Sequence, residues 1–173
     1  SESRGLGDVY KRQVIHLAAH KSVSESINNP MMYYENNIGS IMSVILAMQE
    51  TDCKKIIFSS SATVYADSSI SPIGENAKKN FLNPYAHTKI ISEEIIKSIS
   101  LNKNIINYGI LRYFNPAGAH KSGTLGEISN YSSMNLFPAI SKVLRGDINE
   151  LEVYGSDYNT KDGTCIRDYI HVV

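Results

Sequence analysis

The sequence predicts an α/β fold built around a mostly parallel sheet, and two observations support this prediction. Apolar runs of strand length alternate with longer segments that have helical periodicity. Each predicted strand is also followed by a polar or small-residue stretch, which is where open parallel sheets bind ligands. Strands that alternate with helices need crossover connections, which give parallel pairing and helices on both faces of the sheet. We therefore expect a Rossmann-like, doubly wound sheet.

Three strands are expected, each a short apolar run. They are VIHLAA (residues 14–19), KIIFSSS (55–61) and NYGILRYF (107–114). Two predicted helices separate them, with apolar residues at the three- to four-residue spacing of a helix face. The first follows Pro30, with a stripe at Tyr34, Ile38, Met42, Ile45 and Met48, and the second spans residues 85–99, with Ile91, Ile95 and Ile99.

The pattern divides the chain into three parts. Residues 1–13 are polar and aperiodic, and we interpret them as a non-native leader. Residues 14–115 have the alternating strands and helices. Residues 116–173 loosen into Gly, Ser and Asn, with a helix predicted at 136–144 and a short strand at 151–154. The last part is therefore expected to be a smaller, incomplete region.

Composition argues against several classes of partner. The 17 basic and 17 acidic residues balance, which does not favour nucleic acid or an anionic membrane. No apolar run approaches the length of a membrane span, and the first residues lack the apolar middle of a secretory signal. Cys53 and Cys165 match no metal-site spacing. We expect a soluble, cytoplasmic protein with reduced thiols and no metal, nucleic-acid or membrane partner.

A tyrosine and a lysine stand four residues apart near the start of the second predicted helix. Tyr85 and Lys89, in PYAHTK, should therefore share one helix face. A free tyrosine has a pKa of about 10, but a neighbouring ammonium stabilises the phenolate and lowers that pKa. The spacing alone decides little, because many helix surfaces have solvated pairs of this kind.

Three serines at the end of the preceding strand add context to this pair. Ser59, Ser60 and Ser61 follow the apolar residues 56–58, at the place where such sheets bind ligands. A hydroxyl there can share a proton with a base. For Ser59 and Ser60 we favour a simpler interpretation, in which they begin a loop and satisfy backbone groups. Ser61 is the remaining candidate.

Four motifs together resemble those of the UDP-glucose 4-epimerases of the extended short-chain dehydrogenase/reductase superfamily. They are SSSATVY, PYAHTK, LRYFNPAGAH and DGTCIRDYIHV, and the resemblance runs from Val14 to Val173. It implies an isomerase of galactose metabolism that interconverts UDP-glucose and UDP-galactose through a 4-keto intermediate, with NAD regenerated in each turnover. It also implies that residues 14–115 are the C-terminal part of the NAD-binding Rossmann domain, that 116–173 bind substrate, and that the full protein is a homodimer.

The resemblance assigns roles to individual residues. Tyr85 would be the base that deprotonates the sugar 4-hydroxyl, Lys89 would lower its pKa and bind the nicotinamide ribose, and Ser61 would bridge tyrosine and substrate. Contacts to NAD are implied for Leu17, Ala18, Ala19, His20, Lys21, Asn36, Ser61, Tyr85, Lys89 and Phe114. Contacts to the UDP-sugar are implied for Ser61, Tyr85, Asn115, Asn135, Leu136, Glu152, Val153, Tyr154 and Arg167.

Some of these residues also have simpler interpretations. Lys21 could be a solvated cation, Phe114 a core residue, and Arg167 a surface partner of Asp168 in place of a ligand for the diphosphate. The Gly-rich loop that holds the cofactor pyrophosphate in this superfamily is absent from the sequence. We therefore expect a fragment lacking both ends, which by itself binds NAD weakly or not at all and is inactive.

The alternatives are related enzymes and a protein without turnover. A 4,6-dehydratase needs an Asp-Glu pair where this chain has Ala62 and Thr63, so elimination of water is disfavoured. Epimerases for UDP-N-acetylglucosamine, UDP-glucuronate or UDP-arabinose stay open. An inactive sugar-nucleotide sensor also stays open, although the joint presence of Ser61, Tyr85 and Lys89 argues against it. A purely structural α/β module explains none of the four motifs.

Overall fold

The computed structural model describes residues 12–51, 53–65, 72–101, 106–126, 135–153 and 155–173. The chain forms two compact units, Ser1–Tyr113 and Phe114–Val173. Their boundary lies two residues before the one predicted after residue 115.

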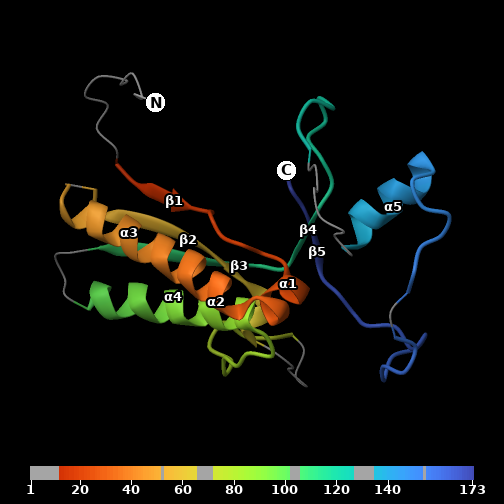
Figure 1. Cartoon of the computed structure of the whole chain (residues 1–173), viewed down its shortest axis with the longest axis horizontal. Helices are drawn as coiled ribbons and strands as arrows, with labels where there is room; N and C mark the ends of the chain where they lie inside the picture. The colour runs from red at the N-terminus through yellow and green to blue at the C-terminus, as the bar shows by residue number, and fades with distance from the viewer. Residues whose placement is uncertain (1–11, 52, 66–71, 102–105, 127–134, 154) are drawn as a thin grey trace. The chain divides into compact units, whose positions relative to one another are not determined.

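The first unit is built on a three-stranded sheet with the order β1-β2-β3 (Figure 1). Strands β1 (Val14–His16), β2 (Lys55–Ser61) and β3 (Asn107–Tyr113) are all parallel, which confirms the predicted α/β class. β1 is shorter than the predicted strand because the chain leaves the sheet after His16. The backbone of His20 pairs with a side chain of the next helical segment instead.

Helical segments connect the strands. α1 (Val23–Asn28), α2 (Pro30–Tyr33), the π-helical turn η1 (Tyr34–Ile38) and α3 (Gly39–Gln49) follow β1, and the 3-10 turn η2 (Ala62–Tyr65) and α4 (Pro84–Ser100) follow β2. The start of α4 is fixed by Pro84 at its first position and by Asn83, whose side chain accepts a hydrogen bond from the Ala86 N–H at 2.8 Å. This cap places Tyr85 in the first turn of the helix.

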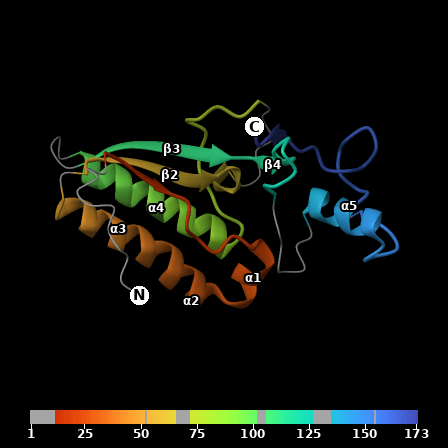
Figure 2. The same cartoon turned by 90° about the horizontal axis from the view of Figure 1, so that it is seen from above.

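α3 and α4 lie on the same face of the sheet (Figure 2). Between helices and sheet is an apolar core of Ile41, Ile45, Met48, Cys53, Ile56, Phe58, Ile96 and Ile106. Within the residues that the structure describes, no helix of this unit covers the opposite face, where Ile15 is 59% exposed. The doubly wound arrangement is therefore seen for one face only.

The π-helical turn changes the predicted apolar stripe. A π-helical turn contains an extra residue, so it rotates every later side chain about the helix axis. The buried residues are Tyr33, Asn37, Ile41, Ile45 and Met48, whereas Met42 of the predicted stripe is 49% exposed. In α4 the predicted Ile91, Ile95 and Ile99 are half-buried, and the inward face contains Ala86, Lys89, Glu93 and Ile96. That face is partly polar because it contacts the end of β2.

The second unit contains the parallel pair β4 (Asn115–Ala117) and β5 (Tyr169–His171) and the helix α5 (Leu136–Arg145). α5 confirms the predicted helix and ends at Gly146, whose φ of 77° suits a residue without a side chain. The strand predicted at 151–154 is wrong for residues 151–153. A strand requires a paired neighbour, and β4 pairs with β5 instead. Tyr154 lies outside the described residues.

Candidate active site at the end of β2

Ser61, Tyr85 and Lys89 come together where β2 ends and α4 begins. Hydrogen bonding from Ser61 lowers the pKa of the Tyr85 phenol, and Lys89 Nζ donates to the Ser59 carbonyl oxygen at 2.7 Å. The same ammonium lies 5.8 Å from the centroid of the Tyr85 ring. Ser61 and Lys89 are only 8% and 4% exposed. The three side chains therefore form one cluster, while their catalytic roles remain a prediction.

β2 ends at Ser61, as the strand predicted at 55–61 does, so Ser59 and Ser60 do not begin a loop. Pairing between β2 and β3 continues through Ser61, so Ser59 and Ser60 are strand residues as well. The turn comes one residue later, in η2, where the Thr63 N–H and hydroxyl donate to Ser61 Oγ at 3.3 and 3.0 Å. Because Ser61 accepts these bonds, its own proton is available to donate toward the Tyr85 oxygen. Thr63 thus orients the serine.

The electrostatics of Tyr85 differ from the prediction. Burial raises the pKa of Tyr85, and this effect outweighs the hydrogen bond from Ser61 and the positive charge of Lys21, which both lower it. Lys89 is directed to the Ser59 carbonyl, and burial lowers the pKa of its own ammonium to about 8. The positive charge of Lys21, an exposed residue, thus also favours the Tyr85 phenolate. The role predicted for Lys89, to lower the pKa of Tyr85, stays a prediction.

Asn37 fixes the segment after β1, in which residues 17–21 are the predicted cofactor contacts. Its Oδ1 accepts from the His20 N–H at 2.8 Å, and its Nδ2 donates to the His20 carbonyl and to Thr88 Oγ1, both at 3.1 Å. Thr88 precedes Lys89 in α4, so one buried amide links this segment to the catalytic helix. The predicted Asn36 is exposed and donates to Asn37 Oδ1 at 2.9 Å. Sequence reasoning missed Asn37, because a polar residue does not stand out in a search for an apolar stripe.

Replacing Asn37 by Leu is expected to destabilise the chain by about 2 kcal/mol, because it leaves the His20 N–H and carbonyl without their partners. Urea unfolding followed by circular dichroism measures the change. Glu35→Leu is the matched control, and we expect it to stay within about 0.5 kcal/mol because Glu35 is an exposed residue of the same turn. Equal losses in the two variants would contradict an anchoring role for Asn37.

The other predicted ligand contacts belong to the second unit. The Asn115 side chain donates to the Asp168 carbonyl oxygen at 2.8 Å, which joins β4 to β5. Arg167 is exposed, and in the described part of the chain it forms no ion pair with Asp168. Phe114 is 41% exposed and so is not a core residue of this unit. Exposed side chains also occur at Asn135, Leu136, Glu152 and Val153.

Comparisons with known proteins find similar sequences and structures. The model of the NAD dependent epimerase/dehydratase family matches residues 7–173, which includes part of the segment interpreted as a leader. UDP-glucose 4-epimerase 3 of Oryza sativa subsp. japonica is 49% identical over 160 residues, which are 92% of this chain and 43% of the relative.

Two solved structures are also similar. UDP-glucose 4-epimerase from Stenotrophomonas maltophila, with bound NAD and formylated UDP-arabinopyranose, has a TM-score of 0.90 at 40% identity, over 93% of this chain and 48% of that one. UDP-glucose 4-epimerase from Bifidobacterium longum, in complex with NAD+ and UDP, has a TM-score of 0.87 at 44% identity, over the same shares. The chain thus spans less than half the length of these relatives.

Proposed function

Because the chain belongs to the NAD dependent epimerase/dehydratase family, we propose that the whole protein is an epimerase that interconverts UDP-glucose and UDP-galactose with NAD as its cofactor. The cluster of Ser61, Tyr85 and Lys89 at the carboxyl end of β2 is the observation that carries this proposal. Open parallel sheets bind their ligands at this end. The identity of 49% to a UDP-glucose 4-epimerase supports this substrate pair.

Tyr85 and Ser61 each have a step that their position in the cluster suits. The Tyr85 phenolate removes the proton of the sugar 4-hydroxyl and becomes a neutral phenol. Ser61 donates to the phenolate oxygen before this transfer and to the substrate oxygen during it. Lys21 adds positive charge near the same oxygen. When bound, NAD would supply the acceptor for the hydride of sugar carbon 4 and the donor that returns this hydride to the opposite face of the 4-keto sugar. Tyr85 returns its proton to the sugar oxygen in that second transfer, which completes the epimerisation and leaves Tyr85 as the phenolate again.

The segment after β1 fits an anionic dinucleotide. Asn37 holds its backbone beside α4, and the Lys21 ammonium lies close enough to Tyr85 to lower its pKa. We propose that the first unit belongs to the NAD-binding domain and the second to the substrate-binding region. Proposed NAD contacts are Leu17, Ala18, Ala19, His20, Lys21, Asn36, Ser61, Tyr85, Lys89 and Phe114. Proposed sugar-nucleotide contacts are Ser61, Tyr85, Asn115, Asn135, Leu136, Glu152, Val153, Tyr154 and Arg167.

The test is an assay of the whole protein that approaches the equilibrium between UDP-glucose and UDP-galactose from both sides. UDP-N-acetylglucosamine and UDP-N-acetylgalactosamine are assayed in parallel. Turnover of the acetylated pair alone would contradict the proposed substrate. Binding of UDP-sugars without any turnover would instead favour a sensor.

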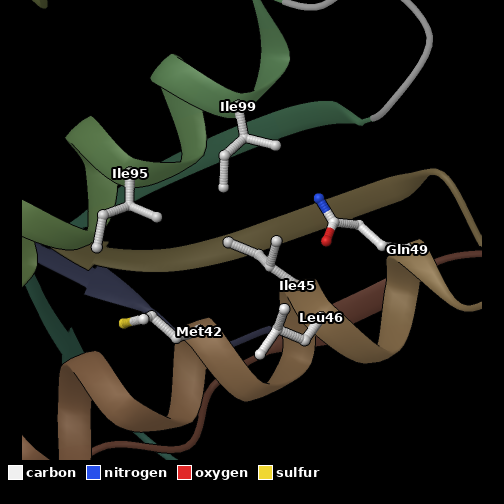
Figure 3. A pocket seen from close by; sticks show the side chains of 6 residues that line it. All are labelled: Met42, Ile45, Leu46, Gln49, Ile95 and Ile99. Atoms are coloured by element: carbon white, nitrogen blue, oxygen red, sulfur yellow. The ribbon is translucent and has the colours of Figure 1, made fainter.

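We propose that the whole protein is a homodimer that associates through α3 and α4. An apolar groove of about 290 Å³ runs between these helices and is lined by Met42, Ile45, Leu46, Gln49, Ile95 and Ile99 (Figure 3). Met42 and Leu46 are 49% and 58% exposed. A second copy covers such a surface most simply, because a twofold interface brings the same two helices from each protomer together.

Leu46→Glu is expected to shift the whole protein from dimer to monomer and to weaken association by about a hundredfold, because the dimer would bury an unpaired carboxylate. Sedimentation velocity over a range of concentrations measures the change. Ala47→Glu is the matched control, since Ala47 is exposed on the same helix but does not line the groove. A dimer that tolerates Leu46→Glu as well as Ala47→Glu would disprove this interface.

We also propose a cytoplasmic location. Cys53 and Cys165 are both free thiols, as a reducing compartment would keep them. Within the described residues, none of the helices combines the length and the apolar character that crossing a bilayer requires.

A further inference from the structure

Glu93 is the centre of a buried polar network next to the site. Its side chain is fully buried in α4, yet both carboxylate oxygens are paired. Oε1 accepts from Ser60 Oγ at 2.6 Å and from Arg112 Nε at 2.9 Å, and Oε2 accepts from Arg112 Nη2 at 2.8 Å and from Lys79 Nζ at 3.3 Å. Burial opposes the charge, but the bonds from Arg112 and Ser60 prevail and lower the pKa of Glu93 to about 2.

We propose that Glu93 is a positioning residue for the epimerase reaction, which fixes α4 against β2 and thereby sets the contact between Ser61 and Tyr85. This inference rests on the proposed function. Tyr85, Lys89 and Glu93 are spaced four residues apart on one face of α4. Each of them interacts with one of three consecutive residues of β2. Tyr85 interacts with the Ser61 hydroxyl, Lys89 donates to the Ser59 carbonyl oxygen, and Glu93 accepts from the Ser60 hydroxyl.

The contact made by Glu93 is the most demanding of the three in geometry. A planar guanidinium that meets a carboxylate with two parallel bonds tolerates little displacement. Sliding α4 by one residue moves it about 1.5 Å, which would break that pairing. A misplacement of about 1 Å at reacting groups can cost about a hundredfold in rate. A buried ion pair adds little net stability compared with apolar residues, so its value here is a fixed geometry.

Arg112 extends this control to the turn that follows β2. Its Nη1 donates to the Tyr65 hydroxyl and to the Glu75 carbonyl oxygen, both at 2.7 Å. Its guanidinium also lies 5.0 Å from the centroid of the Tyr65 ring. Tyr65 ends η2, the same short turn from which Thr63 holds Ser61. The network therefore fixes Ser61 through the turn and Tyr85 through the helix.

The experiment compares kcat, KM and the pH profile of the whole protein in three variants. Ser60→Ala removes one hydroxyl and leaves the pair of Glu93 and Arg112 in place. Glu93→Gln keeps the shape of the side chain but can turn an N–H₂ group toward Arg112. Glu94→Gln is the matched control, because Glu94 is the neighbouring exposed carboxylate on α4. Kinetics are measured well below the melting temperature of every variant.

We expect kcat to fall about tenfold in Ser60→Ala and about a hundredfold in Glu93→Gln, with KM within about threefold of the control. The rising limb of the pH profile should move to higher pH, because a weaker bond from Ser61 leaves the pKa of Tyr85 higher. Ser60→Ala changes none of the charged groups nearby. Those around Glu93 are Arg112 from β3, Lys79 from the segment before α4, and Lys97 from α4, and those around Tyr85 are Lys21 and Lys89. The shift therefore reports the contact between Ser61 and Tyr85.

A second measurement does not depend on turnover. Carbon-13 NMR of ring-labelled tyrosine follows the titration of Tyr85, whose signal is assigned by its loss in Tyr85→Phe. A higher Tyr85 pKa in Ser60→Ala than in Glu94→Gln supports positioning by this network, even if the parent turns over no UDP-sugar and the proposed function fails. If Ser60→Ala and Glu93→Gln only lower the melting temperature, with kcat and the Tyr85 pKa equal to the control, the inference is overturned.

Discussion

Tyr85→Phe is expected to lower kcat of the whole protein by about a hundred- to ten-thousand-fold, the range that a positioned acid or base contributes. The substitution removes only the phenol oxygen, which is the atom that Ser61 hydrogen-bonds and Lys21 stabilises. The phenylalanine ring can still pack as the tyrosine ring does, so KM should change little. Steady-state conversion of UDP-galactose to UDP-glucose measures the loss.

The matched control for this prediction is Tyr108→Phe. Tyr108 is a tyrosine of β3 that is 42% exposed and lies outside the cluster of Ser61, Tyr85 and Lys89. Its loss of an oxygen should leave kcat within about twofold of the parent, as expected for an exposed site away from the chemistry. Retention of more than a tenth of the parent activity in Tyr85→Phe would exclude Tyr85 as the base.

The strands and the grouping of Ser61, Tyr85 and Lys89 could be predicted because their signals are local. The apolar run before Ser61 ends where the ligand edge of a parallel sheet begins, and the spacing of Tyr85 and Lys89 places both on one helix face. The structure confirms these placements. The predicted helical stripe was wrong for Met42, because periodicity assumes a uniform helix and a π-helical turn has no simple composition signal.

The supporting residues could not be predicted, because their partners are far away in sequence. From the sequence alone, Glu93 looks like one of several charged residues on an exposed helix face. Its partners Ser60 and Arg112 come close to it only in the folded structure. Asn37 likewise reads as a surface amide until the segment after β1 folds back to place His20 against it. The effect of the Lys21 charge on the pKa of Tyr85 could not be predicted for the same reason, because the two residues lie far apart in sequence.

Lys89→Met is expected to make the chain more stable at pH 7 by about 1–2 kcal/mol, while kcat of the whole protein falls by about a hundredfold or more. Burial lowers the pKa of Lys89 from 10.5 to about 8, so holding its charge in the folded state costs about 3 kcal/mol. The substitution also removes the hydrogen bond to the Ser59 carbonyl oxygen, and this loss lowers the stability by about 1 kcal/mol. A methionine also packs well against the Phe58 ring, which lies 5.0 Å from the ammonium.

The lowered pKa of Lys89 also makes the free energy of unfolding depend on pH. Between about pH 8 and pH 10.5 the unfolded chain binds a proton at Lys89 that the folded chain has released, so the free energy of unfolding of the parent rises with pH there. Below about pH 8 the cost of the buried charge is fully present. Urea unfolding at pH 7 to 10 should show that rise in the parent and in Lys55→Met, an exposed lysine on β2, and a flatter profile in Lys89→Met. If Lys89→Met is less stable than the parent at pH 7, the buried ammonium stabilises the fold. That result would contradict the prediction that its burial costs stability.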